Sequence, residues 1–305
     1  MVLLTVIGYP DYSLTKIIVE KLQATEVGVY DKVFPDGEFY VRLLEPEKIT
    51  SSVAVVVSTL YPEQEKRLLK TLLLVDAVKR SNPARTVALI PYLAYSRQDK
   101  VFLNGEPVSA CLIVRMLRSA GVDVLLTVDV HSLRVLECFD GSSINVMVSD
   151  ILVKHALKHS SNPVVIAPDK GALERASLAA KQNNLEYDYL IKQRDRVTGE
   201  VRYMPREINI EGRDVIIVDD IISTGGTIAE SSKILLRNGA RRIIVAATHG
   251  LLVGEAVKKL ESAGVSKIIL ADTLGVKHDH HLIEYADISS KLIEELNNKI
   301  VLSGK

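Results

Sequence analysis

Residues 215–228 read Val-Ile-Ile-Val-Asp-Asp-Ile-Ile-Ser-Thr-Gly-Gly-Thr-Ile, and this stretch decides the fold. Four apolar β-forming residues lead into two adjacent carboxylates, Asp219 and Asp220. An apolar run without alternation is typical of a parallel strand that is buried on both faces. A helical pattern follows as far as Gly239. The stretch therefore predicts a strand, a loop and a helix in the order of an α/β protein.

The loop between this strand and this helix has the residue types of a phosphate site. It consists of Ser223, Thr224, Gly225, Gly226 and Thr227. Glycines let the backbone come close to a ligand, and free N–H groups at a helix start cradle phosphate. Two acids beside a phosphate suit ribose hydroxyls or a magnesium ion. We expect a site for a phosphorylated sugar, although many glycine-rich turns after strands only cap a helix.

The overall composition excludes several classes of protein. The 305 residues suffice for about two domains. Lys plus Arg and Asp plus Glu each number 38, and Trp is absent, so nothing favours a nucleic-acid partner. The apolar run at residues 2–7 is too short to span a bilayer, and Cys111 and Cys138 have neither metal-site nor disulfide-framework spacing. We expect a soluble, cytoplasmic, globular protein without a membrane partner.

Strand-like runs alternate with helical patterns along the chain, which predicts parallel α/β units. The expected strands are residues 3–8, 28–34, 40–44, 53–58, 86–91, 123–130, 164–167, 187–192, 214–219, 242–248 and 267–272. The expected helices are residues 15–22, 66–79, 112–119, 150–158, 172–181, 228–237 and 253–262.

The chain also contains an internal repeat. Residues 82–88 are similar to residues 238–244, and residues 119–122 are similar to residues 262–265, with similar spacing in each half. Junctions between helices and strands often look alike, so the repeat has a plain explanation. It also fits two similar lobes, each a mainly parallel sheet flanked by helices.

In the two-lobe interpretation, residues 58–62 take the place that residues 219–227 hold in the second lobe. The first lobe has no acids and no glycines there, so we expect only the second lobe to bind the sugar phosphate. The boundary is expected near residues 145–149, before a helix that begins at Asp150.

Residues 34–38, Phe-Pro-Asp-Gly-Glu, join two expected strands. Asp-Gly favours a hairpin turn, which is the plain interpretation. An exposed Phe34 beside Asp36 and Glu38 is unusual for a turn alone. An aromatic face can stack on a purine while carboxylates accept hydrogen bonds from its amino group, so the turn is a candidate base-binding element.

Polar side chains follow two more expected strands, where ligands of open α/β sheets bind. Arg97 can clamp a phosphate, and Gln98 and Asp99 can read a base or order a neighbouring group. Asp129 and His131 lie two residues apart on an extended segment, so both can approach one ion. The alternatives are a solvated loop for the first group and a histidine that caps the next helix for the second.

Two further stretches carry charges that could serve a phosphate site. Asp169 follows another expected strand and could hold magnesium or simply cap a helix. Lys192 and Arg194 begin a polar segment with a turn at Gly199. Such a segment is usually a solvated hairpin tip, but basic residues on a mobile tip can also close over a polyphosphate. Residues 278–281 hold three histidines without a completing metal pattern, so we expect a solvent loop there.

Taken together, these motifs resemble those of the ribose-phosphate pyrophosphokinase (PRPP synthetase) family over nearly the whole chain. The loop at residues 219–227 resembles the PRPP loop of the type I phosphoribosyltransferase group. The resemblance implies two phosphoribosyltransferase-like domains, residues 1–147 on the ATP side and residues 148–305 with the ribose-5-phosphate loop. The last helix would pack back on the first domain. The implied activity is Mg²⁺-dependent transfer of the pyrophosphoryl group of ATP to the C1 hydroxyl of ribose 5-phosphate, giving PRPP and AMP.

The resemblance also assigns roles position by position. The implied catalytic residues are Lys192 and Arg194. The implied ATP-binding residues are Phe34, Asp36, Gly37, Glu38, Arg97, Gln98 and Asp99. The implied ribose-5-phosphate-binding residues are Arg194, Asp219, Asp220, Ser223, Thr224, Gly225, Gly226 and Thr227. The implied metal-linked residues are His131 and Asp169, with Asp129 and Asp140 added. In the family the turn at residues 34–38 normally comes from a neighbouring subunit, which implies at least a dimer, or else a tetramer or hexamer.

The chain departs from the family pattern at Ser223, where many members have Asp, and at Lys100, where many have Arg. Residues 144–145 lack an acid that some members place there, so the resemblance does not imply a full second metal site. Two other functions stay open. One is a type I phosphoribosyltransferase, which would leave the first lobe unexplained. The other is a non-catalytic PRPP-synthetase-like regulatory protein, which loss of Lys192 or Arg194 would indicate.

Overall fold

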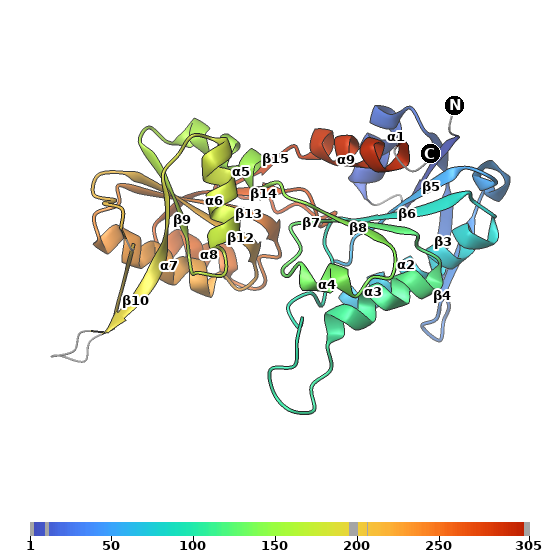
Figure 1. Ribbon diagram of the computed structural model, residues 1–305, viewed down its shortest axis with the longest axis horizontal. Helices are drawn as coiled ribbons and strands as arrows, with labels where there is room; N and C mark the ends of the chain where they lie inside the picture. The colour runs from blue at the N-terminus through green and yellow to red at the C-terminus, as the bar shows by residue number, and fades with distance from the viewer. Residues whose placement is uncertain (1–2, 10–11, 195–200, 206, 302–305) are drawn as a thin grey trace. The chain divides into compact units, whose positions relative to one another are not determined.

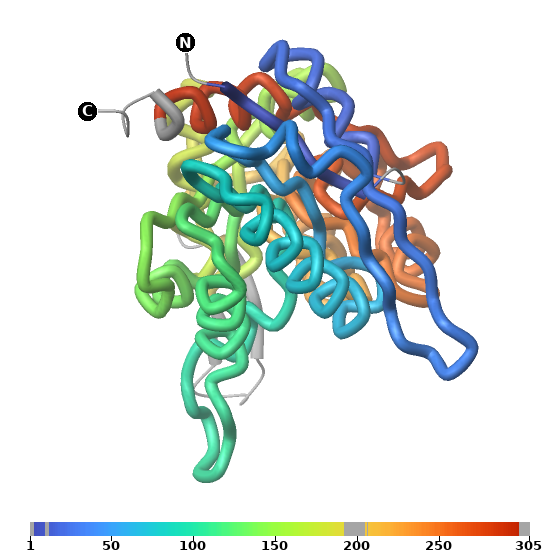
Figure 2. Tube along the Cα trace, turned by 90° about the vertical axis from the view of Figure 1, so that its right-hand side faces the viewer, coloured from blue at the N-terminus to red at the C-terminus, as the bar shows by residue number. Residues whose placement is uncertain are grey.

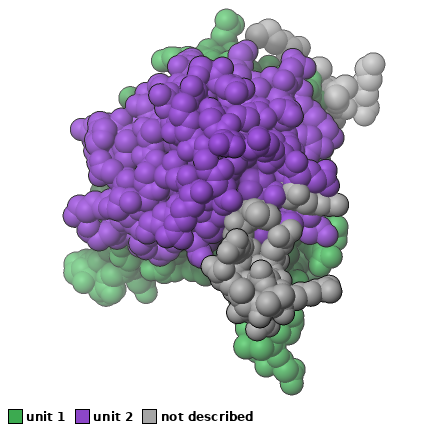
Figure 3. Space-filling model, turned by 90° about the vertical axis from the view of Figure 1, so that its left-hand side faces the viewer, with its two compact units in different colours: residues 1–146, 273–276, 289–305 green, residues 147–272, 277–288 purple. Residues whose placement is uncertain are grey.

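The structure is a computed structural model that describes residues 3–9, 12–194, 201–205 and 207–301 (Figure 1). The chain divides into two compact units, which Figure 3 colours separately. Unit 1 comprises residues 1–146, 273–276 and 289–305, and unit 2 comprises residues 147–272 and 277–288. No helix among the described residues is long and apolar enough to cross a membrane.

Unit 1 is built on a parallel sheet with the strand order β2-β1-β5-β6-β7-β8. Its strands are β1 (Leu4–Gly8), β2 (Thr25–Val27), β5 (Val53–Val57), β6 (Arg85–Ile90), β7 (Val124–Val128) and β8 (Ser142–Val146), and β3 (Val29–Val33) and β4 (Phe39–Leu43) form a separate antiparallel hairpin. Its helices are α1 (Ser13–Leu22), α2 (Gln64–Arg80), α3 (Ser109–Ala120), α4 (Arg134–Glu137) and α9 (Ser289–Val301), with the 3-10 helix η1 (Pro46–Ile49). Every residue of the apolar strand β5 is buried, because both faces of a parallel sheet are covered.

Unit 2 is built on a sheet with the order β11-β10-β9-β12-β13-β14-β15, parallel except for the β10–β11 pair. Its strands are β9 (Pro163–Ala167), β10 (Tyr187–Arg194), β11 (Val201–Pro205), β12 (Asp214–Ile222), β13 (Arg242–Gly250), β14 (Val265–Ala271) and β15 (Ile283–Ala286). Its helices are α5 (Ser149–Ala156), α6 (Leu173–Gln182), α7 (Gly226–Arg237) and α8 (Ala256–Ser262), with the 3-10 helix η2 (Leu157–His159). The core holds the apolar side chains of β9, β12, β13 and β14.

Apart from the edge strand β11, the two sheets have the same strand order. β2-β1-β5-β6-β7-β8 in unit 1 corresponds to β10-β9-β12-β13-β14-β15 in unit 2. The repeated segments of the sequence lead into corresponding strands, β6 and β13 for the first pair and β7 and β14 for the second. The predicted α/β fold with two similar lobes is therefore confirmed.

Each unit is completed by a helix that follows the last strand of the other unit's sheet. β8 of unit 1 leads into α5, which packs on α6, β13 and β14 of unit 2. β15 of unit 2 leads into α9, which packs on α1 and β8 of unit 1 and lies beside α1 in Figure 2. Leu292 and Leu296 of α9 are fully buried, and Lys21 Nζ donates to Ser289 Oγ at 2.7 Å.

The structure differs from the sequence-based expectations mainly at short elements. The strands β2, β8, β11 and β15 and the helix α4 were not expected. β12 continues to Ile222 instead of ending at Asp219, because β13 supplies partners as far as Gly250. β10 likewise runs on through Lys192 to Arg194, because β11 pairs with it.

The cysteines are a clear correction. Cys111 in α3 and Cys138 after α4 form a disulfide, with their Cα atoms 5.2 Å apart. They lie 27 positions apart in sequence, and the packing of α4 against α3 brings them together. The spacing of the two cysteines in the sequence did not indicate this disulfide.

Candidate functional site

The loop after β12 lies at the carboxyl edge of the unit 2 sheet and turns into α7. Gly225 has a φ of +72°, a left-handed conformation that a side chain would strain. A Cβ atom at Gly225 would also lie 3.3 Å from the carbonyl oxygen of Ala256 and 3.3 Å from Cγ of Leu260. The sequence therefore needs glycine here for both the backbone angle and the packing of α8.

Exposed polar groups surround the first turn of α7. Thr224, Gly226 and Thr227 are exposed, and Ser223 is half-buried. A Cβ atom at Gly226 would meet only Thr224 Oγ1, at 3.8 Å, so the space in front of the helix start is open. The first N–H groups of a helix lack partners within the helix and attract anions. The loop is therefore a credible cradle for a phosphate group.

Asp219 and Asp220 lie within β12, three residues before the loop begins. The Asp220 N–H donates to Asp219 Oδ1 at 2.9 Å, and Arg175 Nη2 lies 3.8 Å from Asp220 Oδ2. Burial, and next the negative charge of Asp220, raise the pKa of Asp219 to about 8. The Asp219 carboxyl group therefore keeps its proton at neutral pH, so it can donate as well as accept hydrogen bonds.

Arg175 is a site residue that the sequence-based reasoning missed. It lies on α6, and its side chain and that of Asp220 are only 11% and 7% exposed. A largely buried guanidinium beside a carboxylate pair balances charge that could not be left alone in the interior. One feature of the sequence could have indicated Arg175: it lies in the first turn of the predicted helix after Asp169, and so at the same edge of the sheet.

Asp169 follows β9 at the same carboxyl edge, and it is exposed. Its Oδ1 accepts hydrogen bonds from the N–H groups of Gly171 at 2.7 Å and Ala172 at 3.1 Å. The carboxylate thus satisfies backbone donors in the turn that leads into α6. Its oxygens are also of the kind that Mg²⁺ prefers, so the residue fits a metal role that remains a prediction.

Lys192 and Arg194 lie at the end of β10, in the antiparallel pair that β10 and β11 form at the edge of the unit 2 sheet. Their backbones pair with Tyr203 and Val201 of β11. Both lie inside an antiparallel pair, whereas the expected strand ended at Lys192 and left Arg194 beyond it. Their side chains, and the turn at Gly199, lie outside the described residues.

The Phe34 turn joins β3 and β4 as a hairpin, as the Asp-Gly pattern indicates. The Phe34 N–H donates to the carbonyl oxygen of Glu38 at 2.8 Å, and Gly37 has a φ of +97°. The Phe34 ring is 37% exposed and lies edge-on to Tyr40, with the Lys32 ammonium 4.5 Å from its centroid. Every residue of the turn is exposed, so its aromatic and acidic groups face solvent.

The loop after β6 holds Arg97, Gln98 and Asp99. Arg97 is exposed, whereas Gln98 is fixed against the start of α3: its carbonyl oxygen accepts from the Ala110 N–H at 3.2 Å, and its side-chain oxygen accepts from the hydroxyl of Ser109. Arg97 is thus available to a ligand, and Gln98 orders the loop that presents it.

Asp129 and His131 follow β7 at the carboxyl edge of the unit 1 sheet. Asp129 is fully buried with a φ of +40°, whereas His131 is exposed. Asp140 precedes β8 and lies at the amino edge, since β7 and β8 are parallel with Val124 opposite Ser142. Five strand residues at about 3.3 Å each separate the two edges, so the structure does not bring Asp140 together with the other two.

Comparison with known proteins covers both units. Residues 4–121 match the N-terminal domain of ribose phosphate pyrophosphokinase, and residues 143–273 match the phosphoribosyl transferase domain. A solved structure, phosphoribosylpyrophosphate synthetase from Mycobacterium smegmatis, is similar with a TM-score of 0.87 at 27% sequence identity, covering 99% of each chain.

Two relatives are similar along most of their length. The ribose-phosphate pyrophosphokinase of Aeropyrum pernix is 40% identical over 271 residues, which is 88% of this chain and 87% of the relative. That of Sulfurisphaera tokodaii is 40% identical over 291 residues, 94% of this chain and 96% of the relative. The fold, the glycine-bearing loop behind an acid pair and these matches lead to one conclusion: the chain belongs to the ribose-phosphate pyrophosphokinase family.

Proposed function

We propose that this chain transfers the pyrophosphoryl group of ATP to the C1 hydroxyl of ribose 5-phosphate, releasing PRPP and AMP. The observation that carries the proposal is the anion cradle at residues 223–227, directly behind two carboxylates at the carboxyl edge of unit 2. A sugar phosphate has the matching parts, a dianion at one end and hydroxyl groups at the other.

The sugar phosphate would be held by residues of unit 2. Its phosphate group would accept hydrogen bonds from the N–H groups at the start of α7 and from the hydroxyls of Thr224 and Thr227. Asp219 and Asp220 would bind the ribose hydroxyls, with the protonated Asp219 able to donate one hydrogen bond. Ser223 cannot supply the carboxylate that many family members have there.

The nucleotide would be held by residues of unit 1. Arg97 would pair with the phosphates, and the exposed turn at residues 34–38 would stack on the adenine and accept from its amino group. By the family pattern, that turn would serve a neighbouring subunit, so we also propose a homo-oligomer. The functional domain limits that go with this assignment are residues 1–147 and 148–305.

Mg²⁺ is the cofactor that this reaction would need, because the transferred group is a polyphosphate. The Asp169 carboxylate is an oxygen donor that fits it, whereas the imidazole of His131 is a less suitable ligand for so hard an ion. When bound, the ion would neutralise phosphate charge.

The chain's own contribution to the chemical step would be positioning and charge. The C1 oxygen must approach the β-phosphorus in line, and such transfers need little general-base help. Lys192 and Arg194 would stabilise the charge that develops on the phosphates. We also propose a cytoplasmic location, which rests on the resemblance to the family. The Cys111–Cys138 disulfide does not add support, because disulfides are uncommon in that compartment.

The test is direct. Purified protein is mixed with ATP, Mg²⁺ and ribose 5-phosphate, and AMP and PRPP are measured together. Equal amounts of both products support the proposal. A second mixture contains PRPP, Mg²⁺ and a nucleobase. Consumption of PRPP there, with no PRPP formed in the first mixture, would support a phosphoribosyltransferase instead. Nucleotide binding without turnover in either assay would indicate a non-catalytic protein.

A further inference from the structure

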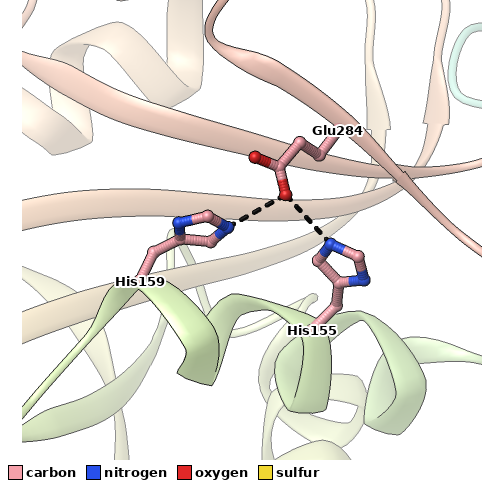
Figure 4. Close-up of side chains that lie close together, drawn as sticks. All are labelled: His155, His159 and Glu284. Carbon is pink, nitrogen blue, oxygen red and sulfur yellow. Dashed lines mark hydrogen bonds and ion pairs between the residues drawn. The ribbon is translucent and has the colours of Figure 1, made fainter.

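Three side chains converge beside the edge strand of the unit 2 sheet, outside the site described above. His155 lies on α5, His159 ends η2, and Glu284 lies on the edge strand β15. Glu284 Oε2 is 3.0 Å from His155 Nε2 and 2.9 Å from His159 Nε2 (Figure 4). The side chains are 19%, 28% and 35% exposed, so the cluster is sheltered but reachable.

The donor set is that of a transition-metal site with three protein ligands. Two imidazole nitrogens and one carboxylate oxygen suit Zn²⁺, Co²⁺ or Ni²⁺ and leave a fourth position for water. The three donor atoms all lie within 4.8 Å of one another. Bonds of about 2.1 Å in a tetrahedral site place ligand atoms about 3.4 Å apart. The two distances from Glu284 to the histidines would lengthen by about half an ångström, and the two imidazole nitrogens, now within 4.8 Å, would move together by at most about 1.4 Å.

Glu284 is already oriented for such a role by a fourth side chain. Lys267 Nζ lies 2.8 Å from Glu284 Oε1 and also donates to the carbonyl oxygen of His281 at 3.0 Å. The lysine therefore occupies one carboxylate oxygen and leaves Oε2 directed at the two imidazoles. Hydrogen bonds to a ligating carboxylate fix its position and improve binding.

The surface beside the cluster affects both how an ion would reach the three ligands and how tightly it would bind. A cavity of about 670 Å³ is lined by His159, Lys158, Arg242 and Lys267, among other residues, and provides a route from solvent. Its basic side chains repel a cation, and Glu284 is the one carboxylate among the three donors. The affinity should therefore be lower than that of a closed structural zinc site, which adds more negative charge through cysteine ligands.

We propose that His155, His159 and Glu284 bind one divalent transition-metal ion that is separate from the Mg²⁺ chemistry of the carboxyl edge. Glu284 lies level with Val218 of β12 in the sheet register, but β15 is three strands away from β12, so about 14 Å of sheet separates their backbones. The ion would join the edge strand β15 to α5 and would stabilise unit 2 when bound. Without the ion, the same groups hydrogen-bond one another, and binding would displace the Nε2 protons.

The chain contains its own control. Glu261, His280 and His281 also lie within ligand distance of one another, but the side chains of His281 and Glu261 are 70% and 46% exposed. Exposed donors lose more side-chain freedom when an ion fixes them, so they bind weakly. His281→Gln therefore tests binding by exposed histidines, and His155→Gln and Glu284→Gln test the proposed site.

The experiment titrates ZnCl₂ into the full-length, chelator-treated protein by calorimetry, with excess Mg²⁺ present to occupy oxygen-ligand sites. We expect one zinc per chain in wild type and in His281→Gln, and at least tenfold weaker binding in His155→Gln and Glu284→Gln. Circular dichroism confirms that each variant is folded. Co²⁺ should give the visible absorption of a tetrahedral site in wild type, and His155→Gln should lose it.

Two outcomes would overturn the proposal. One is zinc binding that is unchanged in both His155→Gln and Glu284→Gln. The other is binding that disappears in His281→Gln, which would place the ion on the exposed histidines. A rise in melting temperature with ZnCl₂ in wild type but not in Glu284→Gln would support a bond between β15 and α5.

Discussion

Replacing Asp219 with Asn should change how the stability of the ligand-free protein depends on pH. The pKa of Asp219 is about 8 in the folded chain, because the carboxyl group is buried beside Asp220, and about 3.8 for an ordinary aspartate. Between these values the folded chain holds one proton more than the unfolded chain. The free energy of unfolding of the wild type therefore falls as pH rises through this window, by linkage.

The size of the effect follows from the shift. One bound proton changes the free energy of unfolding by about 1.36 kcal/mol per pH unit, so the change from pH 5 to pH 7 is about 2.7 kcal/mol. Asp219 keeps some contact with solvent, which makes this an upper value. Asp219→Asn has no proton to lose at this position. The difference in free energy of unfolding between variant and wild type should therefore shift in favour of the variant by up to about 2.7 kcal/mol from pH 5 to pH 7.

The assay is urea unfolding followed by circular dichroism at pH 5, 6 and 7, with wild type and variant compared at each pH so that other titrating groups cancel. Asp214→Asn is the matched control. A hydrogen bond from Arg241 lowers the pKa of Asp214, so its loss should destabilise the protein by the same amount at all three pH values. A constant difference between wild type and Asp219→Asn from pH 5 to pH 7 would refute the assignment of a raised pKa.

Three further predictions concern the proposed reaction. Gly225→Val should abolish ribose-5-phosphate binding, measured by calorimetry, and leave ATP binding largely intact, because the side chain would strain the turn and contact α8; unchanged sugar affinity would contradict it. Lys192→Ala should lose roughly 10²–10⁴-fold in kcat with little change in KM. The loss of kcat in the double variant with Arg194→Ala should be smaller than the product of the two single losses, because both side chains act on the same phosphates. A raised KM for ATP with kcat preserved would make Lys192 a binding contact instead. Phe34→Ala should weaken ATP binding, and sedimentation should find the active wild-type species to be an oligomer; an active monomer would argue against the shared nucleotide site.

The parts of the fold that the sequence predicted are those with strong local signals. β5 and β12 are apolar runs that only a covered parallel sheet accommodates, and Gly225 stands at a turn that demands glycine. The correspondence of the two sheets was visible in residues 82–88 and 238–244, because equivalent junctions need equivalent residues. Short edge strands such as β15 lack this signal, since four residues carry little periodicity.

The parts that could not be predicted depend on contacts between segments far apart in sequence. The Cys111–Cys138 disulfide needs α4 to pack on α3, and the ion pair of Arg175 with Asp220 needs α6 to lie beside β12. The raised pKa of Asp219 depends on the same packing, because desolvation is its largest cause. Gln98 was predicted to read a base or to order a neighbour. Its side-chain oxygen accepts a hydrogen bond from Ser109 at the start of α3, and the identity of that partner depends on the course of the loop.

The exchange of α5 and α9 between the units has a consequence for synthesis on the ribosome. Residues 1–146 emerge first, but α9, which covers α1 and β8, is made last. Part of the apolar surface of unit 1 therefore stays uncovered while the ribosome translates unit 2. Unit 2 has no such delay, since α5 precedes its sheet. The first half of the nascent chain thus exposes apolar surface for longer than the second, and such exposure favours aggregation.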